Sequence, residues 1–432
     1  MLSSAHRAAH HAAHHADVVI VGAGVSGLAA AHHLIAAGVT VSVLEGADDP
    51  GGRMATDSAD GFRLDRIGQL LSTTYTEPAR TPGLEALVLR PFAPGVLVHG
   101  ADGKQARAGA LTPARALASG SLDQARLSAA LGRLAALPVE RLLARPERTA
   151  LAALRSRGLP PRTVNGILRP LLATLLRDPE LTTSSRVADL ALRTFARGRL
   201  AVPEGGAATL PGLLAAALPP GTVRTGVRVR SVATNLVTTE EHGDFACRSV
   251  LLATGARAAA ELLPGLRVPA FHEVTVIHHA TPAPLPWDGS LLLDADPTWP
   301  LAHTTVMSAV DPTRAPAGRG LVTTTVHGPP PPARTVASRL ARLYDTSTRD
   351  WELLAVHHTP EAVPAMPPPH DLRRPVRVLA GLYVCGDHRD SNTVDGALHS
   401  ARRAATALLR DFGVPLPAHH GAPVPAAACP AA

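Results

Sequence analysis

Apolar residues occur along this 432-residue chain in two patterns, short continuous runs and longer stretches at helical spacing. The run 17–21, Asp-Val-Val-Ile-Val, predicts a buried strand. A glycine turn separates it from a helical pattern over about 26–37, and a second apolar run covers 40–45. The order strand, glycine turn, helix, strand is typical of a βαβ unit that begins a parallel sheet.

Leucines and alanines recur every three or four residues between about 112 and 200, where prolines interrupt them. This pattern predicts several short amphipathic helices with their leucine faces in the core, and contact with a membrane surface is the alternative. Further apolar runs predict strands within 84–109, 222–233, 249–255, 267–327 and 376–386, and helical spacing predicts helices at 335–345 and 395–411.

These elements predict an α/β protein in which a Rossmann-type, glutathione-reductase-like nucleotide-binding domain carries an inserted α+β substrate domain. We expect the nucleotide domain to be discontinuous, over 17–95, 201–265 and 371–412. The substrate or cap domain would comprise 96–200 and 266–370. A His-rich stretch, 1–16, and a tail rich in Pro and Ala, 413–432, are predicted to be disordered.

Composition narrows the function classes. No run of eighteen apolar residues predicts a membrane span, and 1–16 lacks the apolar core of a secretion signal. The three cysteines are far apart, which fits a reducing compartment, so we expect a cytoplasmic protein, with peripheral membrane contact as an alternative. The net charge of +7 comes from scattered arginines with few aromatics, which indicates a solvated surface rather than a nucleic-acid site.

The N-terminal stretch contains histidine pairs four residues apart. They would bind a metal only if the stretch were helical, and a frayed terminus without a metal is the simpler interpretation. These residues are His6, His10, His11, His14 and His15.

The first glycine turn is the strongest chemical signal. Gly22, Gly24 and Gly27 form a G-x-G-x-x-G, in which the glycines permit a tight turn, backbone approach to a pyrophosphate, and close packing of helix on strand. Glu45 lies 23 residues after Gly22, where a carboxylate can accept hydrogen bonds from ribose hydroxyls. The motif predicts dinucleotide binding, and a glycine turn in an unrelated βαβ unit is the alternative.

Four further motifs follow in order: Gly51-Gly-Arg53, Val202-Pro-Glu-Gly-Gly206, Ala253-Thr-Gly255, and Cys385-Gly-Asp387 with Val394-Asp-Gly-Ala397. With the glycine turn, they resemble the flavin-dependent amine oxidase superfamily, which includes protoporphyrinogen oxidases and phytoene desaturases. The resemblance covers most of 17–411 and implies noncovalent FAD as the cofactor. No metal is expected.

The resemblance also implies which residues bind FAD. The pyrophosphate would lie at Gly22, Gly24, Ser26 and Gly27, with Arg53 beside the phosphates and Gly51 and Gly52 against the cofactor. The adenosine would meet Glu45 and Val229, and Asp387 would bind the ribityl–phosphate end. Gly68, Gln69 and Val394 would approach the flavin ring, and Gly255 and Gly386 complete the set.

Amine oxidases of this superfamily carry a lysine beside the flavin and an aromatic cage. The only lysine here is Lys104, in an Asp-Gly turn, and the only tyrosines are Tyr75, Tyr344 and Tyr383, of which Tyr383 is nearest the last motif. The segments 167–186 and 363–368 resemble the desaturase and protoporphyrinogen oxidase branch. No catalytic residue is assigned: His357 or His358 is either a base or a solvated or packed strand histidine.

The expected activity is transfer of a hydride from a C–H or C–N bond of a small apolar organic substrate to FAD. The electron acceptor would be oxygen, a quinone or a carrier protein, and no nucleic acid is expected. The alternatives are a non-redox FAD-dependent isomerase, an amine oxidase with an atypical site, and an FAD-binding protein without chemistry.

Overall fold

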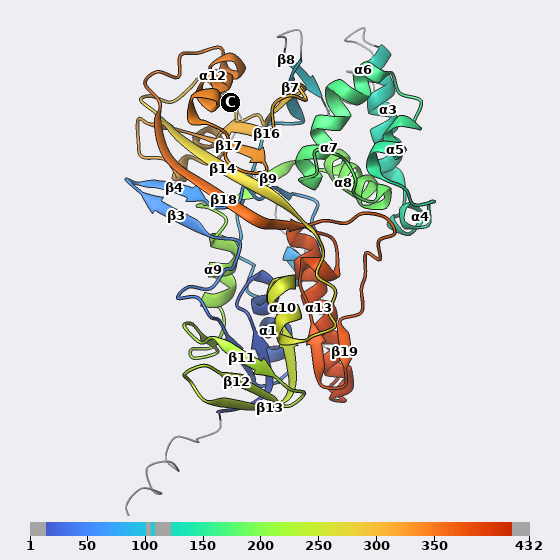
Figure 1. The fold of residues 1–432 in the computed structure, drawn as a ribbon, viewed down its shortest axis with the longest axis vertical. Coiled ribbons are helices and arrows are strands. Elements are labelled where there is room, and N and C mark those ends of the chain that lie inside the picture. The colour runs from blue at the N-terminus through green and yellow to red at the C-terminus, as the bar shows by residue number, and fades with distance from the viewer. Residues whose placement is uncertain (1–13, 101–104, 109–121, 417–432) are drawn as a thin grey trace, which may run out of the picture.

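The structure is a computed structural model that describes residues 14–100, 105–108 and 122–416 (Figure 1). Two large sheets lie at opposite ends of the long axis, and a group of helices lies beside the upper sheet (Figure 1). Lys104, Cys429, and the histidines up to residue 11 are outside the described residues.

The first sheet has eight strands built around a parallel centre. The strand β13 pairs with β1 along one edge, while its other edge pairs with antiparallel β12 at its start and parallel β20 at its end. The strand order is therefore β10-β2-β1-β13-β12-β11, with β20 and then β19 beside the end of β13. The strands are β1 His14–Val21, β2 Val41–Leu44, β10 Val223–Arg224, β11 Val229–Val232, β12 Leu236–Thr239, β13 Asp244–Leu252, β19 Arg377–Leu379 and β20 Leu382–Val384.

Four helices accompany this sheet: α1 Val25–Ile35, α9 Thr209–Ala216, α10 Ala256–Leu262 and α13 Val394–Asp411. The run Ala29–Ala31 of α1 is fully buried, and Ala401, Ala404 and Ala405 of α13 are in the same core cluster. Because both helices have alanines there, they pack closely side by side (Figure 1). Their first turns lie together at the carboxyl ends of the parallel strands.

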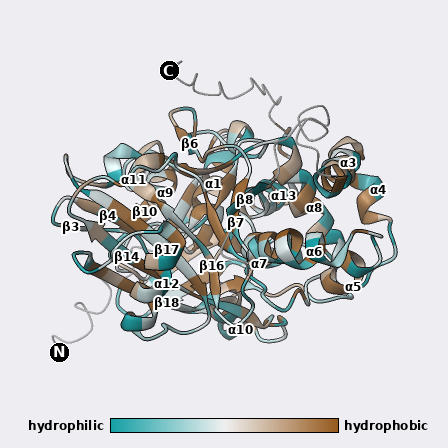
Figure 2. Ribbon diagram, turned by 90° about the horizontal axis from the view of Figure 1, so that it is seen from above, coloured by the Kyte–Doolittle hydropathy of each residue, from teal (hydrophilic) through white to brown (hydrophobic). Residues whose placement is uncertain are grey.

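The second sheet has seven strands in the order β18-β14-β17-β16-β15-β7-β8. The strands are β7 Val96–His99, β8 Gln105–Ala108, β14 Phe271–Thr281, β15 Leu292–Asp294, β16 Leu301–Val306, β17 Gly320–His327 and β18 Glu352–Pro364. The helix α12, Ala333–Tyr344, buries Val336, Leu340 and Leu343 in a cluster with Val322 and Val326 of β17. Figure 2 shows hydrophobic residues gathered in the middle of the molecule, around β7 and β16.

Smaller elements connect the two large sheets. One of them is the hairpin of β3 (Thr56–Ala59) and β4 (Phe62–Asp65). A buried ion pair joins it to the segment between β16 and β17, since Arg314 Nη2 lies 2.7 Å from Asp65 Oδ2. A further, three-stranded sheet has the strand order β5-β9-β6. The remaining short elements are β5 Leu71–Ser72, β6 Leu89–Pro91, β9 Leu200–Pro203, α11 Met307–Val310 and the single turns η1 Pro78–Arg80, η3 Pro312–Arg314 and η4 Asp387–Arg389.

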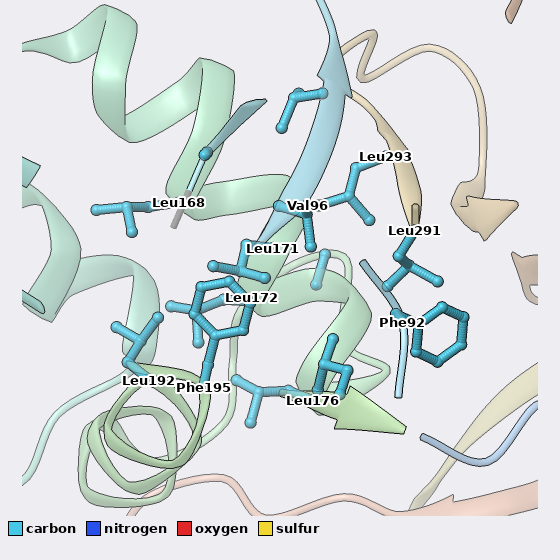
Figure 3. Packing of buried hydrophobic residues seen from close by; sticks show 14 of the residues in the cluster. Phe92, Val96, Leu168, Leu171, Leu172, Leu176, Leu192, Phe195, Leu291 and Leu293 are labelled. Carbon is cyan, nitrogen blue, oxygen red and sulfur yellow. The ribbon is translucent and has the colours of Figure 1, made fainter. Parts of the chain in front are cut away.

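The proline-interrupted stretch forms a set of short helices. They are α3 Leu122–Ala136, α4 Val139–Leu143, α5 Ala150–Arg155, α6 Pro161–Thr163, a π-helical turn η2 Val164–Leu168, α7 Arg169–Leu176 and α8 Ser185–Arg197. Leu171, Leu172 and Leu176 of α7 pack with Leu192 and Phe195 of α8 (Figure 3). Their leucine faces are thus buried in the core, against β7 and β15. Within the described residues, no helix combines the length and apolarity needed to cross a bilayer.

Three boundaries differ from the sequence predictions. The strand β1 begins at His14, three residues early, because it extends its pairing with β13 as far as Phe245. The expected single strand over 222–233 is two strands on opposite edges of the sheet, since the chain turns at Gly226, which has φ +68°. The expected strand over 376–386 is the β19–β20 hairpin.

Residues 413–416, expected to begin the disordered tail, are part of the fold instead. Val414 packs against the core of the first sheet, and its N–H donates to the carbonyl oxygen of Leu409 at 2.9 Å. This bond satisfies one of the last carbonyls of α13. Residues 417–432 are outside the described part of the chain.

Candidate functional site

A cavity of about 1060 Å³ lies at the carboxyl ends of the parallel strands of the first sheet. Parallel α/β sheets bind ligands in this crevice, because the loops that leave the strands diverge there. All of the sequence-predicted FAD-binding residues line the cavity except Gly27 and Gly68. The structure thus brings together residues from Gly22 to Val394.

The glycine turn forms the floor of this cavity. Gly22 has φ +103°, and a Cβ on it would lie 3.1 Å from the backbone of Ala253. A Cβ on Gly24 would meet no atom within 4 Å, so this position faces the open cavity. A Cβ on Gly27 would lie 2.0 Å from the carbonyl oxygen of Gly22, so a side chain there would collide with the turn itself.

The N-terminus of α1 presents free backbone donors beside the turn. The first helical hydrogen bond runs from the N–H of Leu28 to the carbonyl oxygen of Gly24, at 3.0 Å. The preceding N–H groups, of residues 25–27, therefore have no partner within the helix. Together with the positive end of the helix dipole, they favour an anion in the cavity.

Glu45 connects the turn to the end of β2. Its Oε2 accepts from the N–H of Ala23 at 2.7 Å, and its Oε1 accepts from the N–H of Ala47 at 3.0 Å. The carboxylate is therefore fixed at the cavity wall, with lone pairs left for a ligand hydroxyl. Val229, at the start of β11, lines the same part of the cavity.

Arg53 joins three distant parts of the chain. Its Nη2 lies 2.8 Å from Asp387 Oδ2, and its Nη1 donates to the carbonyl oxygen of Ala362 at 2.8 Å. Burial alone would raise the pKa of Asp387, but the charge and hydrogen bond of Arg53 outweigh this effect and lower it. Asp387 is thus ionised at neutral pH, and its charge in turn raises the pKa of Arg53.

The N-terminus of α13 forms the opposite wall. Thr393 caps the helix, since its Oγ1 accepts from the N–H of Gly396 at 3.0 Å, and Val394 is the first helical residue. Ser26 Oγ donates to the carbonyl oxygen of Ala397 at 3.1 Å, which fixes α1 against α13. The positive end of an 18-residue helix is therefore directed at this end of the cavity.

A second cavity of about 480 Å³ adjoins the first near the start of α13. Both cavities are lined by Gln69, Val363, Asn392 and Thr393. Most of the other lining comes from α7, α8, the loop over 72–80 and the first turns of α13. One wall is apolar, and the other is polar and charged; the apolar wall includes Leu175, Val187, Leu190, Ala191 and Phe195.

An ion network that the sequence analysis missed supports the polar wall. Glu77 is 3% exposed, and its two carboxylate oxygens each accept from Arg402 at 2.8 Å. Burial would raise the pKa of Glu77, but Arg402 outweighs it and the pKa is lowered. Asp395 accepts from the N–H of Glu77 at 3.0 Å, and burial together with the charge of Glu77 raises its pKa.

Gly68 and Gln69 occupy the junction between the cavities in different ways. Gln69 lines both, whereas Gly68 lines neither, because its Cα faces Thr325 and a Cβ would lie 2.6 Å from Thr325 Oγ1. The carbonyl oxygen of Gly68 accepts from the guanidinium of Arg177. Arg177 carried no signal in the sequence, since it lies in a leucine-rich stretch that reads as core.

The other candidates from the sequence are elsewhere. His357 and His358 lie on β18 and line neither cavity; they face Asp57 at 3.8 Å and Glu273 at 3.3 Å. His357 is half-buried and His358 is exposed, so both match the interpretation as solvated or packed strand histidines. Tyr383 is fully buried and donates to Asp411, so the tyrosine that lines the second cavity is Tyr75 instead.

Among the described residues we find neither a reactive cysteine nor a cluster of metal ligands. Cys385 is fully buried, and burial raises the pKa of its thiol to about 12, so the thiol is protonated at neutral pH. In residues 14–100, 105–108 and 122–416, no three His, Cys, Asp or Glu side chains gather as metal ligands would. His14 and His15 lie in a strand rather than a helix.

Known proteins similar to this chain share parts of its sequence. Putrescine oxidase of Kocuria rosea is 52% identical over 61 residues, 14% of this chain and 13% of that protein. Phytoene dehydrogenase of Streptomyces griseus is 56% identical over 48 residues, 11% and 10% of the two chains. Polyamine oxidase 1 of Oryza sativa subsp. japonica is 32% identical over 239 residues, 49% and 46%. The chain thus aligns with less than half the length of each relative.

Solved structures match over most of the chain. Putrescine oxidase bound to putrescine has a TM-score of 0.67 at 20% identity, over 92% of this chain and 99% of that one. A proposed protoporphyrinogen oxidase from Exiguobacterium has a TM-score of 0.70 at 18% identity, over 93% and 99%. These likenesses confirm the predicted α/β fold.

A family model described as flavin containing amine oxidoreductase matches residues 25–409, which include the motifs from Ser26 to Val394. This match confirms the resemblance found in the sequence and FAD as the cofactor. The chain therefore belongs to the flavin containing amine oxidoreductase family, a family of FAD-dependent oxidoreductases.

Proposed function

We propose that this chain oxidises a small organic substrate, which binds in the second cavity and gives up a hydride from a C–H bond together with a proton, so that the adjacent C–C or C–N single bond becomes a double bond. One observation carries the proposal: the second cavity meets the cofactor cavity at Gln69 and Thr393, beside the N-terminus of α13. A substrate there would face the flavin end of the cofactor. FAD, when bound, supplies the hydride-accepting chemistry.

The residues present fit FAD. The open space at Gly24 and the free N–H groups of α1 would accommodate the pyrophosphate, with Ser26 beside it. Glu45 would bind the adenosine ribose, and Val229 would lie against the adenine. Arg53, with Asp387, would hold the phosphate and ribityl end.

The remaining assigned residues would surround the cofactor or shape the turn. Gly51, Gly52, Gly255, Gly386 and Gln69 line the cavity and would contact FAD directly. Gly27 and Gly68 would act by permitting close packing. The positive end of α13 at Val394 would favour negative charge on the pyrimidine side of the flavin ring.

The chain's own residues would orient the substrate and exclude water. The apolar wall of α7 and α8 would bind an apolar substrate body, and closing it off from water strengthens the electrostatic interactions inside. Oxygen, a quinone or a carrier protein would accept the electrons. We also propose that the first sheet and its helices form the FAD-binding domain, that the rest forms the substrate domain, and that the protein is cytoplasmic.

The test begins with the visible spectrum of the purified protein and the identity of the cofactor released by acid. We expect acid alone, without proteolysis, to release FAD, as it would from a noncovalent site. Anaerobic addition of amines, porphyrinogens and polyenes should then bleach the flavin for one class, with an oxidised product. A protein that binds FAD but converts a substrate without net oxidation would refute the redox assignment.

A further inference from the structure

Arg177 occupies an unusual place beside the second cavity. It follows the last residue of α7 in a left-handed conformation, with φ +57°, and is 6% exposed. Arg177 is among the residues that line the cavity, and its Nη2 donates to the carbonyl oxygen of Gly68. Because Gly68 directly precedes Gln69, the guanidinium lies at the junction of the two cavities.

No acidic side chain balances this cation in the described part of the chain. The neighbouring Asp178 is occupied, since its Oδ2 accepts from the N–H and the hydroxyl of Thr183, both at 2.7 Å. Nη1 of Arg177 is buried and has no hydrogen-bond partner there. Leaving a buried charged donor unpaired is costly, because its hydration is lost and not replaced.

The surroundings of Arg177 confirm the shortage of negative charge. Burial lowers the pKa of Arg177 to about 10, with no acidic group acting against it. Burial lowers the pKa values of His303 and His327, and the nearby charge of Arg177 lowers them further. Both imidazoles are therefore neutral at pH 7. A buried cation without a partner in the free protein is typical of a residue that awaits an anion.

The rest of the cavity has the same sign of charge. Two of its acidic residues are paired, Glu77 with Arg402 and Asp390 with Arg403 at 3.1 Å and His399 at 2.8 Å. The third is Asp395, whose pKa burial raises. Three more arginines line it, and none has an ion pair within residues 14–100, 105–108 and 122–416; they are Arg193, Arg197 and Arg373. The cavity thus combines excess positive charge with the apolar wall of α8.

We propose that the substrate of this site is a small organic acid, whose carboxylate is bound by Arg177 while its apolar body packs against α8. This inference rests on the proposed function, because it takes the second cavity as the substrate site. It replaces the purely apolar substrate expected from the sequence. A carboxylate beside the guanidinium would supply the charge partner that Arg177 lacks, and a charge-assisted hydrogen bond with it.

The test uses two small probes of equal shape, benzoate and neutral benzamide, titrated into the FAD-loaded protein and followed by the flavin absorption spectrum. We expect benzoate to bind at least about tenfold more tightly, the gain expected of one charge-assisted hydrogen bond. Arg177→Gln should abolish this preference, and Arg177→Lys should keep part of it. Arg155→Gln, an exposed position on α5, is the control for the loss of one positive charge.

Weaker, equal or absent benzoate binding by the unmodified protein would overturn the proposal, even if no Arg177 variant folds. A full preference in a folded, FAD-loaded Arg177→Gln would also overturn it. Because probe binding needs no turnover, its result is separate from that of the substrate screen. A flavin that no substrate bleaches would refute the proposed function and leave the probe result unchanged.

Discussion

The substitution Gly24→Val should block FAD binding at the glycine turn and leave the stability of the fold almost unchanged. Gly24 has φ −73° and ψ 176°, an extended conformation that valine adopts readily, and a Cβ there would meet no protein atom within 4 Å. The apoprotein should therefore fold, with a loss of about 1 kcal/mol at most from placing valine at the N-cap of α1.

The branched side chain would instead occupy the space in front of the free N–H groups of α1. Displacing a phosphate from one or two charge-assisted hydrogen bonds costs about 3 kcal/mol or more, which weakens FAD binding by at least about a hundredfold. Gly27→Ala provides the contrast, because its Cβ would lie 2.0 Å from the carbonyl oxygen of Gly22. That variant should lose thermal stability as well as FAD.

The assay is calorimetric titration of the apoprotein with FAD, together with a thermal melt without FAD. Gly212→Val, an exposed glycine of α9 with no atom near its added Cβ, controls for introducing valine. Unchanged FAD affinity in Gly24→Val would refute the assignment of the pyrophosphate to this turn. A melting temperature as low as that of Gly27→Ala would show that Gly24 serves packing instead.

Three further changes test the site and its surroundings. Glu45→Ala should weaken FAD binding by about ten- to a hundredfold, because it removes a ribose acceptor, whereas Asp48→Ala, on the exposed loop beyond, should leave the titration unchanged. Asp387→Asn should lower flavin content and cost about 1–2 kcal/mol of stability, since Arg53 keeps solvent contact, with a side chain 39% exposed; full flavin content would contradict its role. Acid should destabilise the protein as pH falls from about 6.5 towards 4, because histidines whose pKa is lowered in the fold gain protons on unfolding. Each such histidine should lower the free energy of unfolding by about 1.4 kcal/mol per pH unit. Equal melting temperatures at about pH 7 and pH 5 would refute this. The buried histidines concerned are His278, His279, His327 and His388.

The sequence was most informative where backbone geometry restricts the residue type. Gly22 and Gly27 are detectable because a side chain there would meet the backbone, and a regular spacing results. The strands β1 and β13 were predictable because both of their faces are buried, which requires continuous apolar runs. Family and cofactor followed from the order of such motifs.

Contacts between distant side chains left no local pattern. Glu77 and Arg402 are 325 residues apart, and Arg177 and Gly68 are 109 apart. Nothing in the sequence around Arg177, which follows a leucine-rich helix, shows that its charged side chain is buried. For the pair His357-His358 the sequence left both interpretations open, because only the fold shows that these strand histidines line neither cavity.

The hydrogen bond between Ser26 and Ala397 spans 371 positions and has a consequence for biosynthesis. A ribosome adding about 5–20 residues per second needs roughly 20–75 s to travel from the glycine turn to α13. During that interval β1 also waits for β13, its main partner in the sheet. The nascent chain therefore exposes the β1 edge of the sheet until β13 has emerged, and the wall that α13 adds to the cavity is complete only after α13 has emerged.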